Sequence, residues 1–163
     1  MSGFALGEAS FMLICRRRGD YERKWKVSAA FNVSQKDRVP LELFRDTLGC
    51  GSIRRAGNNG WYWEVNRLSD IVSCVVPFFD RFPLVGKKAD DYTRFRRAVE
   101  LLSKGVLSDT DYITVLELRE LMKNGRHLSL SGLAEIAQIV ETMNHRKPSR
   151  ILRILRGQTP AAS

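Results

Sequence analysis

The opening stretch of the chain, from Gly3 to Phe11, constrains the fold more than any other part of the sequence. Gly3 and Gly7 stand four positions apart, so in a helix both lie on one face, where the missing side chains let a second backbone approach closely. Glu8 comes at the end of this helix, directly before an apolar run that is typical of a strand. Two such helices packed together bring two carboxylates close to each other, and like charges at short range persist only where cations or protons compensate them. The stretch predicts a metal site beside a helix pair; the alternative is a turn with a solvated charge.

The composition favours one domain and a polyanionic partner. With 163 residues, of which 44% are apolar, the chain suits a single domain with a sizeable core. Lys and Arg outnumber Asp and Glu by 27 to 18, and the formal charge of +9 favours nucleic acid first and an acidic membrane second. Cys15, Cys50 and Cys74 are odd in number and widely spaced, which indicates reduced thiols, and two histidines are too few to suggest a zinc site.

No membrane segment and no secretion signal are predicted. The apolar runs stay short of the ~18 residues that span a bilayer, and no charged start is followed by an apolar core. An intracellular, soluble protein without a membrane partner is therefore expected, in the cytoplasm or nucleoid, or in an organelle if the gene lies there.

Two strand hairpins are predicted, one from residues 11–18 and 24–33 and the other from residues 52–55 and 61–65. The second hairpin closes through a Gly- and Asn-rich loop that tolerates positive φ. Side chains alternate along residues 24–33, so one face builds core and the other is polar and basic. The core face comprises Trp25, Val27, Ala29, Phe31 and Val33, and the polar face comprises Lys24, Lys26, Ser28, Ala30 and Asn32.

Helical spacing of apolar residues predicts helices over about 40–48, 69–82, 92–102, 113–123 and 131–143, the second of them interrupted at Pro77. With the opening helix, the element order is αββαββα, which gives an α+β domain whose four-stranded antiparallel sheet has helices on one face. The last two helices are interpreted as supports rather than as binding helices.

This order divides the chain into three parts. Residues 1–105 form the core, and residues 106–156 form a C-terminal helical extension that packs on the core and ends in a basic tail. The tail grips phosphates, lies on the domain, or does both. Residues 157–163 are expected to be a disordered end.

The sheet face away from the helices is predicted to lie against a DNA duplex. Its positions carry almost no carboxylate, whereas a merely solvated sheet face usually mixes both signs of charge. A curved ribbon surface of this kind suits phosphate and base contacts. The residues assigned to it are Arg16, Arg18, Lys24, Lys26, Ser28, Asn32 and Arg54.

The opening stretch resembles the end of the LAGLIDADG motif of homing endonucleases. The run Phe31-Asn32-Val33-Ser34-Gln35 is similar to the second strand of that family, which ends in a Gln, and Pro83-Leu84 followed by Lys87-Lys88 is similar to the loop that supplies an active-site Lys. The order and spacing of these pieces carry the resemblance over residues 3–105 and, more loosely, up to about 156. Two positions depart from the family pattern, with Leu6 where Asp is frequent and Ala9 where Gly is usual.

The resemblance implies a site-specific, intron-encoded endonuclease that hydrolyses both strands of duplex DNA with bound Mg²⁺. By position, Glu8 binds the metal ion and Gln35 orders water near the scissile phosphate. Lys87 or Lys88 stabilises charge there, and Arg38 is a further basic candidate. Mn²⁺ is an alternative ion, Ca²⁺ is expected to support binding without turnover, and no small-molecule cofactor is implied.

With one copy of the motif, the expected active form is a homodimer that reads a long, roughly palindromic site. Its interface is expected to include Gly3, Phe4 and Gly7 of the opening helix. Two other functions share this fold and charge. One is a DNA-binding regulator that does not cut, and the other is an RNA-splicing maturase.

Overall fold

The computed structural model describes residues 8–20, 24–57, 59–105, 107–125 and 127–143. The chain divides into two compact units, the first holding the residues up to Ile14 together with Ser28–Leu107, and the second holding Cys15–Val27 and the residues from Ser108 onward. The second unit therefore includes the end of the first hairpin as well as the C-terminal helices. The predicted opening helix with Gly3, Phe4 and Gly7, the basic tail and the end at 157–163 lie outside the described residues.

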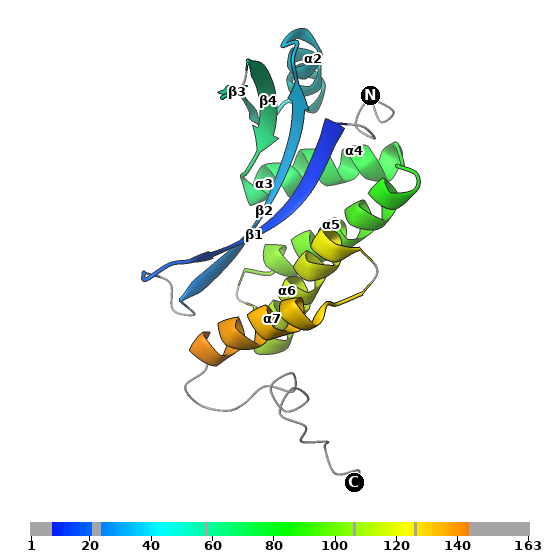
Figure 1. The fold of residues 1–163 in the computed structure, drawn as a ribbon. Coiled ribbons are helices and arrows are strands. Elements are labelled where there is room, and N and C mark those ends of the chain that lie inside the picture. The colour runs from blue at the N-terminus through cyan, green and yellow to red at the C-terminus, as the bar shows by residue number, and fades with distance from the viewer. Residues whose placement is uncertain (1–7, 21–23, 58, 106, 126, 144–163) are drawn as a thin grey trace. The chain divides into compact units, whose positions relative to one another are not determined.

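The predicted four-stranded antiparallel sheet is confirmed (Figure 1). Its strands are β1 (Ala9–Arg17), β2 (Trp25–Gln35), β3 (Ser52–Ala56) and β4 (Gly60–Val65), in the spatial order β1-β2-β4-β3. The central strand β2 pairs with β4 so that Val33 lies opposite Trp63, and β3 pairs with β4 so that Ile53 also lies opposite Trp63. Because directly opposed residues share a face, Val33, Trp63 and Ile53 point to the same side of the sheet.

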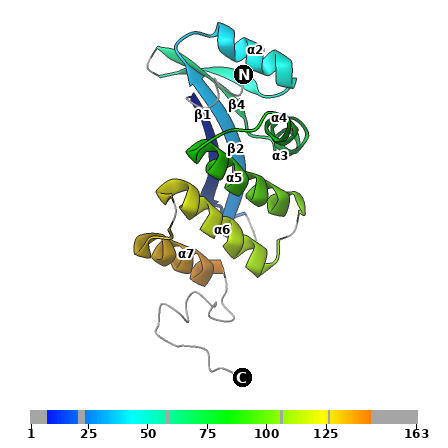
Figure 2. The same ribbon diagram turned by 90° about the vertical axis from the view of Figure 1, so that its right-hand side faces the viewer.

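In the first unit, helices cover one face of the sheet (Figures 1 and 2). They are α3 (Leu68–Asp70), the π-helix η1 (Ile71–Val75), α4 (Val76–Arg81) and α5 (Lys87–Ser103). An aromatic cluster fills the space between strands and helices. Phe11 of β1 lies 5.0 Å from Phe31 of β2, 5.3 Å from Phe79 of α4 and 5.1 Å from Phe95 of α5, measured between ring centres. All four rings are buried, so the cluster is the centre of the core of this unit.

The helix predicted over residues 69–82 contains a π-helical turn rather than a break. Pro77 has no backbone N–H, so the chain cannot continue the regular hydrogen-bond ladder through it. The turn just before it widens instead, and the N–H of Val76 donates to the carbonyl oxygen of Ile71, five residues back. The prediction of a helix disturbed at Pro77 was correct, and the disturbance lies one turn towards the N-terminus.

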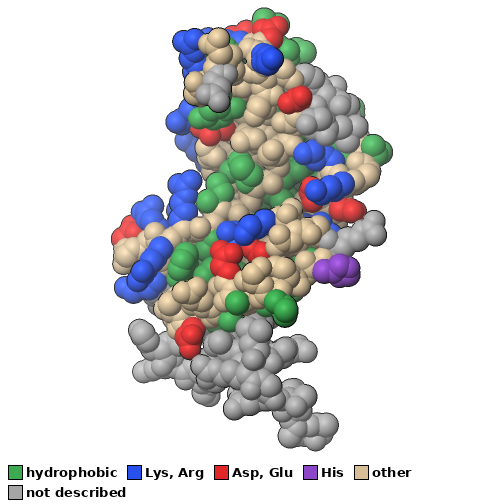
Figure 3. All heavy atoms as spheres, viewed as in Figure 1, with side chains coloured by type: hydrophobic (Ala, Val, Ile, Leu, Met, Phe, Trp, Pro, Cys, Tyr) green, Lys and Arg blue, Asp and Glu red, His purple; other side chains and the backbone are tan. Residues whose placement is uncertain are grey.

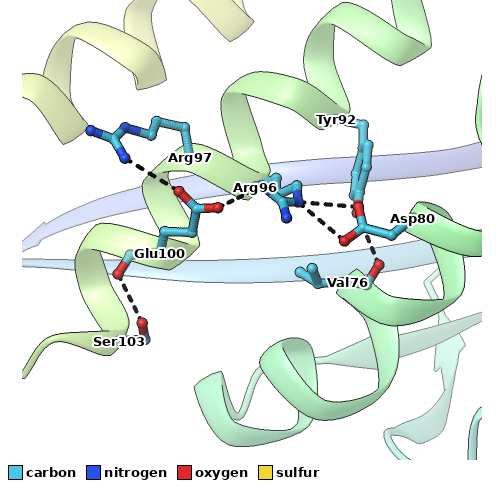
Figure 4. A network of polar contacts seen from close by, with 7 residues as sticks. All are labelled: Val76, Asp80, Tyr92, Arg96, Arg97, Glu100 and Ser103. Atoms are coloured by element: carbon cyan, nitrogen blue, oxygen red, sulfur yellow. Dashed lines mark hydrogen bonds and ion pairs between the residues drawn. The ribbon is translucent and has the colours of Figure 1, made fainter.

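A polar network on the outside of the first unit ties α5 to α4 (Figure 4). The carboxylate of Asp80 accepts hydrogen bonds from the Tyr92 hydroxyl at 2.6 Å and from Arg96 Nε at 3.1 Å. The same hydroxyl lies 2.9 Å from the carbonyl oxygen of Val76. Burial, together with the nearby Asp80 charge, raises the pKa of Tyr92, so its hydroxyl stays protonated and remains a donor. The network holds the first half of α5 in place.

In the second unit, two helices hold the end of the β1–β2 hairpin. They are α6 (Asp109–Asn124) and α7 (Leu130–Met143), as the sequence predicted. Trp25 Nε1 donates to Thr142 Oγ1 at 2.8 Å, and the Tyr112 hydroxyl donates to the Trp25 carbonyl oxygen at 3.0 Å. Glu120, whose side chain is 1% exposed, accepts from Asn124 at 2.8 Å and pairs with Arg119 at 3.2 Å. The interpretation of these helices as supports agrees with these contacts.

The helix α2 (Val39–Leu48) and the turn after it bring β3 alongside β4. Phe44 of α2 stacks on Trp63 with ring centres 5.7 Å apart, and Trp63 Nε1 donates to the Cys50 carbonyl oxygen at 3.0 Å. Gly51 has a φ of +80°, and a Cβ there would lie 2.5 Å from Trp63 Nε1 and 2.6 Å from the Glu64 carbonyl oxygen. Only glycine fits this close approach.

We expect Gly51→Ala to lower the free energy of unfolding by about 3 kcal/mol, because the positive φ costs about 1 kcal/mol and the clash with backbone costs roughly 2 more. Gly49→Ala is the matched control, since Gly49 has a φ of +68° but a Cβ added there would meet none of the described atoms within 4 Å. Urea denaturation of both variants measures the difference. Equal losses in the two variants would contradict the role assigned to the close approach.

Candidate nucleic-acid interface and active site

The sheet face opposite the helices is defined in the first unit by strand register. Asn32 lies opposite Glu64, and Ser52 lies opposite Glu64 on the other side, so these three residues form one row across β2, β4 and β3. A second row is formed in the same way by Ser34, Tyr62 and Arg54. We call this surface the open face. The structure thus places Asn32 and Arg54, both predicted DNA contacts, in adjacent rows of one face.

Two predicted positions of the alternating strand are more enclosed than the sequence indicated. Ser28 and Asn32 are half-buried, and Asn32 Nδ2 lies 3.9 Å from the Met12 sulfur on the neighbouring strand. Ala30, expected on the polar face, is buried. A methyl side chain between two longer neighbours is covered by them, which alternation alone does not reveal.

The open face carries one carboxylate that the sequence analysis did not place there. Glu64 lies in the first row and pairs with Arg54, whose Nε is 2.7 Å from Glu64 Oε1. The expectation that these positions carry almost no carboxylate was therefore incomplete. The error arose because the register of the β3–β4 hairpin decides which residues share a face, and register depends on pairing across the loop.

In the second unit, Lys and Arg side chains gather around the turn between β1 and β2 (Figure 3). Arg16 and Lys26 are exposed near the strand ends, and Arg18 and Lys24 lie in the turn itself. Arg18 forms a two-pronged pair with Asp20, through Nε at 2.8 Å and Nη2 at 2.7 Å. Its hydrogen bonds lower the pKa of Asp20 to about 2, so this carboxylate is charged at neutral pH and offsets the Arg18 charge.

Three of the four predicted catalytic residues belong to segments that lie at one end of the first unit. Glu8 immediately precedes β1 and is exposed, whereas Gln35 is the last residue of β2. Because β1 and β2 are antiparallel neighbours, the start of β1 and the end of β2 lie at the same end of the sheet. Lys88, in the first turn of α5, donates a hydrogen bond from Nζ to the Ala9 carbonyl oxygen, directly beside Glu8. The fourth residue, Lys87, is exposed.

A cationic group also adjoins Gln35. Trp61 pairs directly with Gln35 across the β2–β4 ladder. The guanidinium of Arg38 lies 5.0 Å from the Trp61 ring centre, and that of Arg55 lies 5.9 Å from it. Both distances fit cation–π contacts. Arg38 was a candidate from the sequence, but Arg55 and Trp61 were not, because only the strand register brings them to this end of the sheet.

The metal-ligating groups at the end of the sheet where β1 begins suit a hard divalent ion. Among the described residues no three Asp, Glu, His or Cys side chains stand together, and Glu8 is the carboxylate-bearing residue just before β1. Mg²⁺ is commonly held by one or two carboxylates and keeps several waters, so a single Glu per chain fits it. Zinc takes four nitrogen or sulfur ligands in structural sites, and Cys15, Cys50 and Cys74 are free thiols.

None of the helices in the described part of the chain has both the length and the apolar character of a membrane span.

Comparison with known proteins gives a consistent set of relatives. A family model described as LAGLIDADG endonuclease matches residues 1–99. The probable intron-encoded endonuclease 2 of Neurospora crassa is 28% identical over 146 residues, covering 88% of this chain and 26% of that protein. The chain spans about a quarter of the length of this relative and of a second Neurospora crassa endonuclease.

Two solved structures have similar folds. The homing endonuclease I-TnaI superposes with a TM-score of 0.74 at 26% identity, covering 88% of this chain and 95% of that one. I-SmaMI bound to an uncleaved DNA target in the presence of calcium ions also gives a TM-score of 0.74, at 28% identity, covering 96% of this chain and 55% of that one.

Proposed function

Since the match to the family model covers residues 1–99, this chain belongs to the LAGLIDADG endonuclease family, and we propose that it cuts both strands of a specific DNA duplex as a metal-dependent homodimer. One observation carries the proposal. The ammonium group of Lys88 is held on the Ala9 carbonyl oxygen, so a cation stands beside the carboxylate-bearing residue Glu8 at the edge where Gln35 ends β2. A carboxylate, an amide and a cation at one place are the groups that metal-assisted phosphodiester hydrolysis requires.

Each residue has a distinct part in this chemistry. Glu8 would hold the divalent ion, for which Mg²⁺ is the proposed choice. The bound ion supplies Lewis acidity and an activated water. The Gln35 amide both donates and accepts hydrogen bonds, so it orients a water next to the phosphate. Lys88 places a positive charge where negative charge develops on the phosphate oxygens.

The DNA is proposed to contact the open face of the first unit, and the basic hairpin end of the second unit is proposed to bind phosphates. The open face offers polar side chains for base edges, and the hairpin end offers Arg16, Lys24 and Lys26 for phosphates. Support comes from I-SmaMI, a family member of similar fold whose structure holds a DNA target and calcium ions. Ca²⁺ is accordingly proposed to support binding by this chain without turnover.

A homodimer is proposed because one chain supplies one Glu8, whereas cutting two strands requires two such sites. The interface predicted from the sequence, with Gly3, Phe4 and Gly7, remains part of the proposal. A dimer of this kind reads a roughly palindromic target.

Glu8→Gln is expected to abolish cleavage and to leave duplex binding nearly unchanged. The amide keeps the size of the side chain but removes the negative charge that attracts a hard divalent cation. Nicking in Mg²⁺ and gel-shift affinity in Ca²⁺ are measured for the parent and the variant on a duplex selected from a random library. Full cleavage by the variant contradicts the metal-ligand assignment. Tight specific binding by a parent that never cuts supports the regulator instead.

Lys88→Met is expected to lower the cleavage rate by about a hundredfold or more, whereas Lys87→Met is the matched control and should change it less than threefold. The reason is that Lys88 contacts the backbone beside Glu8, and loss of one stabilising group in an active site typically costs that much. Single-turnover cleavage at saturating protein separates chemistry from binding. An equal loss in both variants would contradict the choice of Lys88.

The complex with a full-length target is expected to contain two copies of the chain. Light scattering coupled to size exclusion gives its mass, with protein alone and DNA alone as references. A stable complex of one chain with a target that is cut on both strands would contradict the homodimer.

A further inference from the structure

Glu64 stands on a surface where a carboxylate is unfavourable. Among the residues of the four strands it is the one Asp or Glu, and the register places it in the first row of the open face between Asn32 and Ser52. This face is proposed to meet polyanionic DNA, so an unpaired carboxylate there would repel phosphates. Its presence requires a compensating contact.

Arg54 supplies that contact in a specific geometry. It belongs to the second row, opposite Tyr62, and reaches diagonally to Glu64, with Nε 2.7 Å from Oε1. The Glu64 side chain is 16% exposed, whereas that of Arg54 is 62% exposed. The carboxylate of Glu64 is therefore largely enclosed, whereas most of the Arg54 side chain that it contacts is accessible to solvent.

Glu64 contacts the Nε atom of Arg54, and this choice of atom determines which hydrogen-bond donors of Arg54 remain available for DNA. With Nε engaged, the two terminal amino groups, Nη1 and Nη2, have no partner among the described residues. They form the end of a rigid planar fork with parallel donors. In the major groove, guanine presents two neighbouring acceptors, O6 and N7, and such a fork matches them. Adenine presents N7 beside an amino donor, which the fork does not match.

The net charge of the Arg54–Glu64 pair distinguishes contact with a guanine base from phosphate binding. The Arg54–Glu64 pair is neutral overall, so it adds little to the attraction that all DNA sequences share. Arg16 and Lys26, which are exposed, suit that task. The pair instead limits the conformations of Arg54, and a side chain already fixed in its reading geometry loses less entropy on binding.

We propose that Arg54 is a specificity-determining residue that reads a guanine in each half of the target, and that Glu64 is the positioning residue that presents it. This inference rests on the proposed function, because it assumes that the open face meets DNA. An ordinary exposed ion pair with no role in recognition is the alternative.

The test measures base preference under conditions that do not require cleavage. In Ca²⁺, the parent and each variant are bound to a set of duplexes in which every position of the selected target is replaced by each of the other base pairs. The variants are Arg54→Ala, Arg54→Lys, Glu64→Ala and Glu64→Gln. Asp46→Ala is the matched control, because Asp46 forms an exposed pair with Arg45 on α2 at 2.8 Å and belongs to no strand of the sheet.

The parent is expected to prefer guanine at one position per half-site by tenfold or more, in line with a bidentate arginine contact. Arg54→Ala and Arg54→Lys should remove this preference, since neither keeps the fork. Glu64→Ala should reduce it severalfold at the same position, and Glu64→Gln should reduce it less, because the amide keeps an acceptor oxygen at the position that contacts Nε. Asp46→Ala should leave every position unchanged, and urea denaturation should show that all variants fold as the parent does.

Two results would overturn the inference alone. One is a parent that selects a sequence but keeps its full guanine preference in Glu64→Ala and Arg54→Ala. The other is a loss of affinity that is equal at all positions, which would indicate a phosphate contact. A parent that binds no duplex with sequence preference would overturn the proposed function, and the inference with it.

Discussion

The first unit depends on the packing of aromatic rings between its strands and its helices. Phe11 contacts four other rings, one on the neighbouring strand and three on α4 and α5. Removing a buried ring of this kind typically costs about 3–5 kcal/mol, whereas an exposed ion pair contributes about 1 kcal/mol or less. Ring packing, more than the Asp80 network on the surface, therefore fixes α5 against β1. The position of Lys88 beside Ala9 is a consequence of that packing.

The same packing determines the opposite face of the sheet. Because side chains alternate along a strand, the residues between the core positions must point away from the helices. Phe31 and Val33 are fully buried, so alternation along the strand places Asn32 and Ser34 on the open face. Substitutions on such a surface cost the core little stability, since the surface positions and the core positions are different residues.

The sequence predicted the elements well and their pairing less well. Alternation and helical spacing are local patterns, and they indicated the sheet, the order of the elements and the disturbance at Pro77. Register and tertiary contact join residues that are distant in sequence. Hence the sequence left Lys87 and Lys88 as equal candidates, and it did not place Glu64 beside Arg54. The opening helix and its glycine pair lie outside the described residues, so that part stays a prediction.

Two arginines on predicted DNA-contacting positions pair with carboxylates, and the geometry of each pair assigns them different tasks. Within the turn, the Asp20 carboxylate accepts hydrogen bonds from both Nε and Nη2 of Arg18. Glu64 contacts Nε of Arg54, whose side chain is 62% exposed. A guanidinium bound on two sides has fewer donors left for a base edge, so Arg18 is better suited to shaping the turn from Arg18 to Lys24, which its backbone N–H also closes at 2.8 Å. The two pairs thus differ in the number of guanidinium nitrogen atoms that contact the carboxylate, two in Arg18 and one in Arg54.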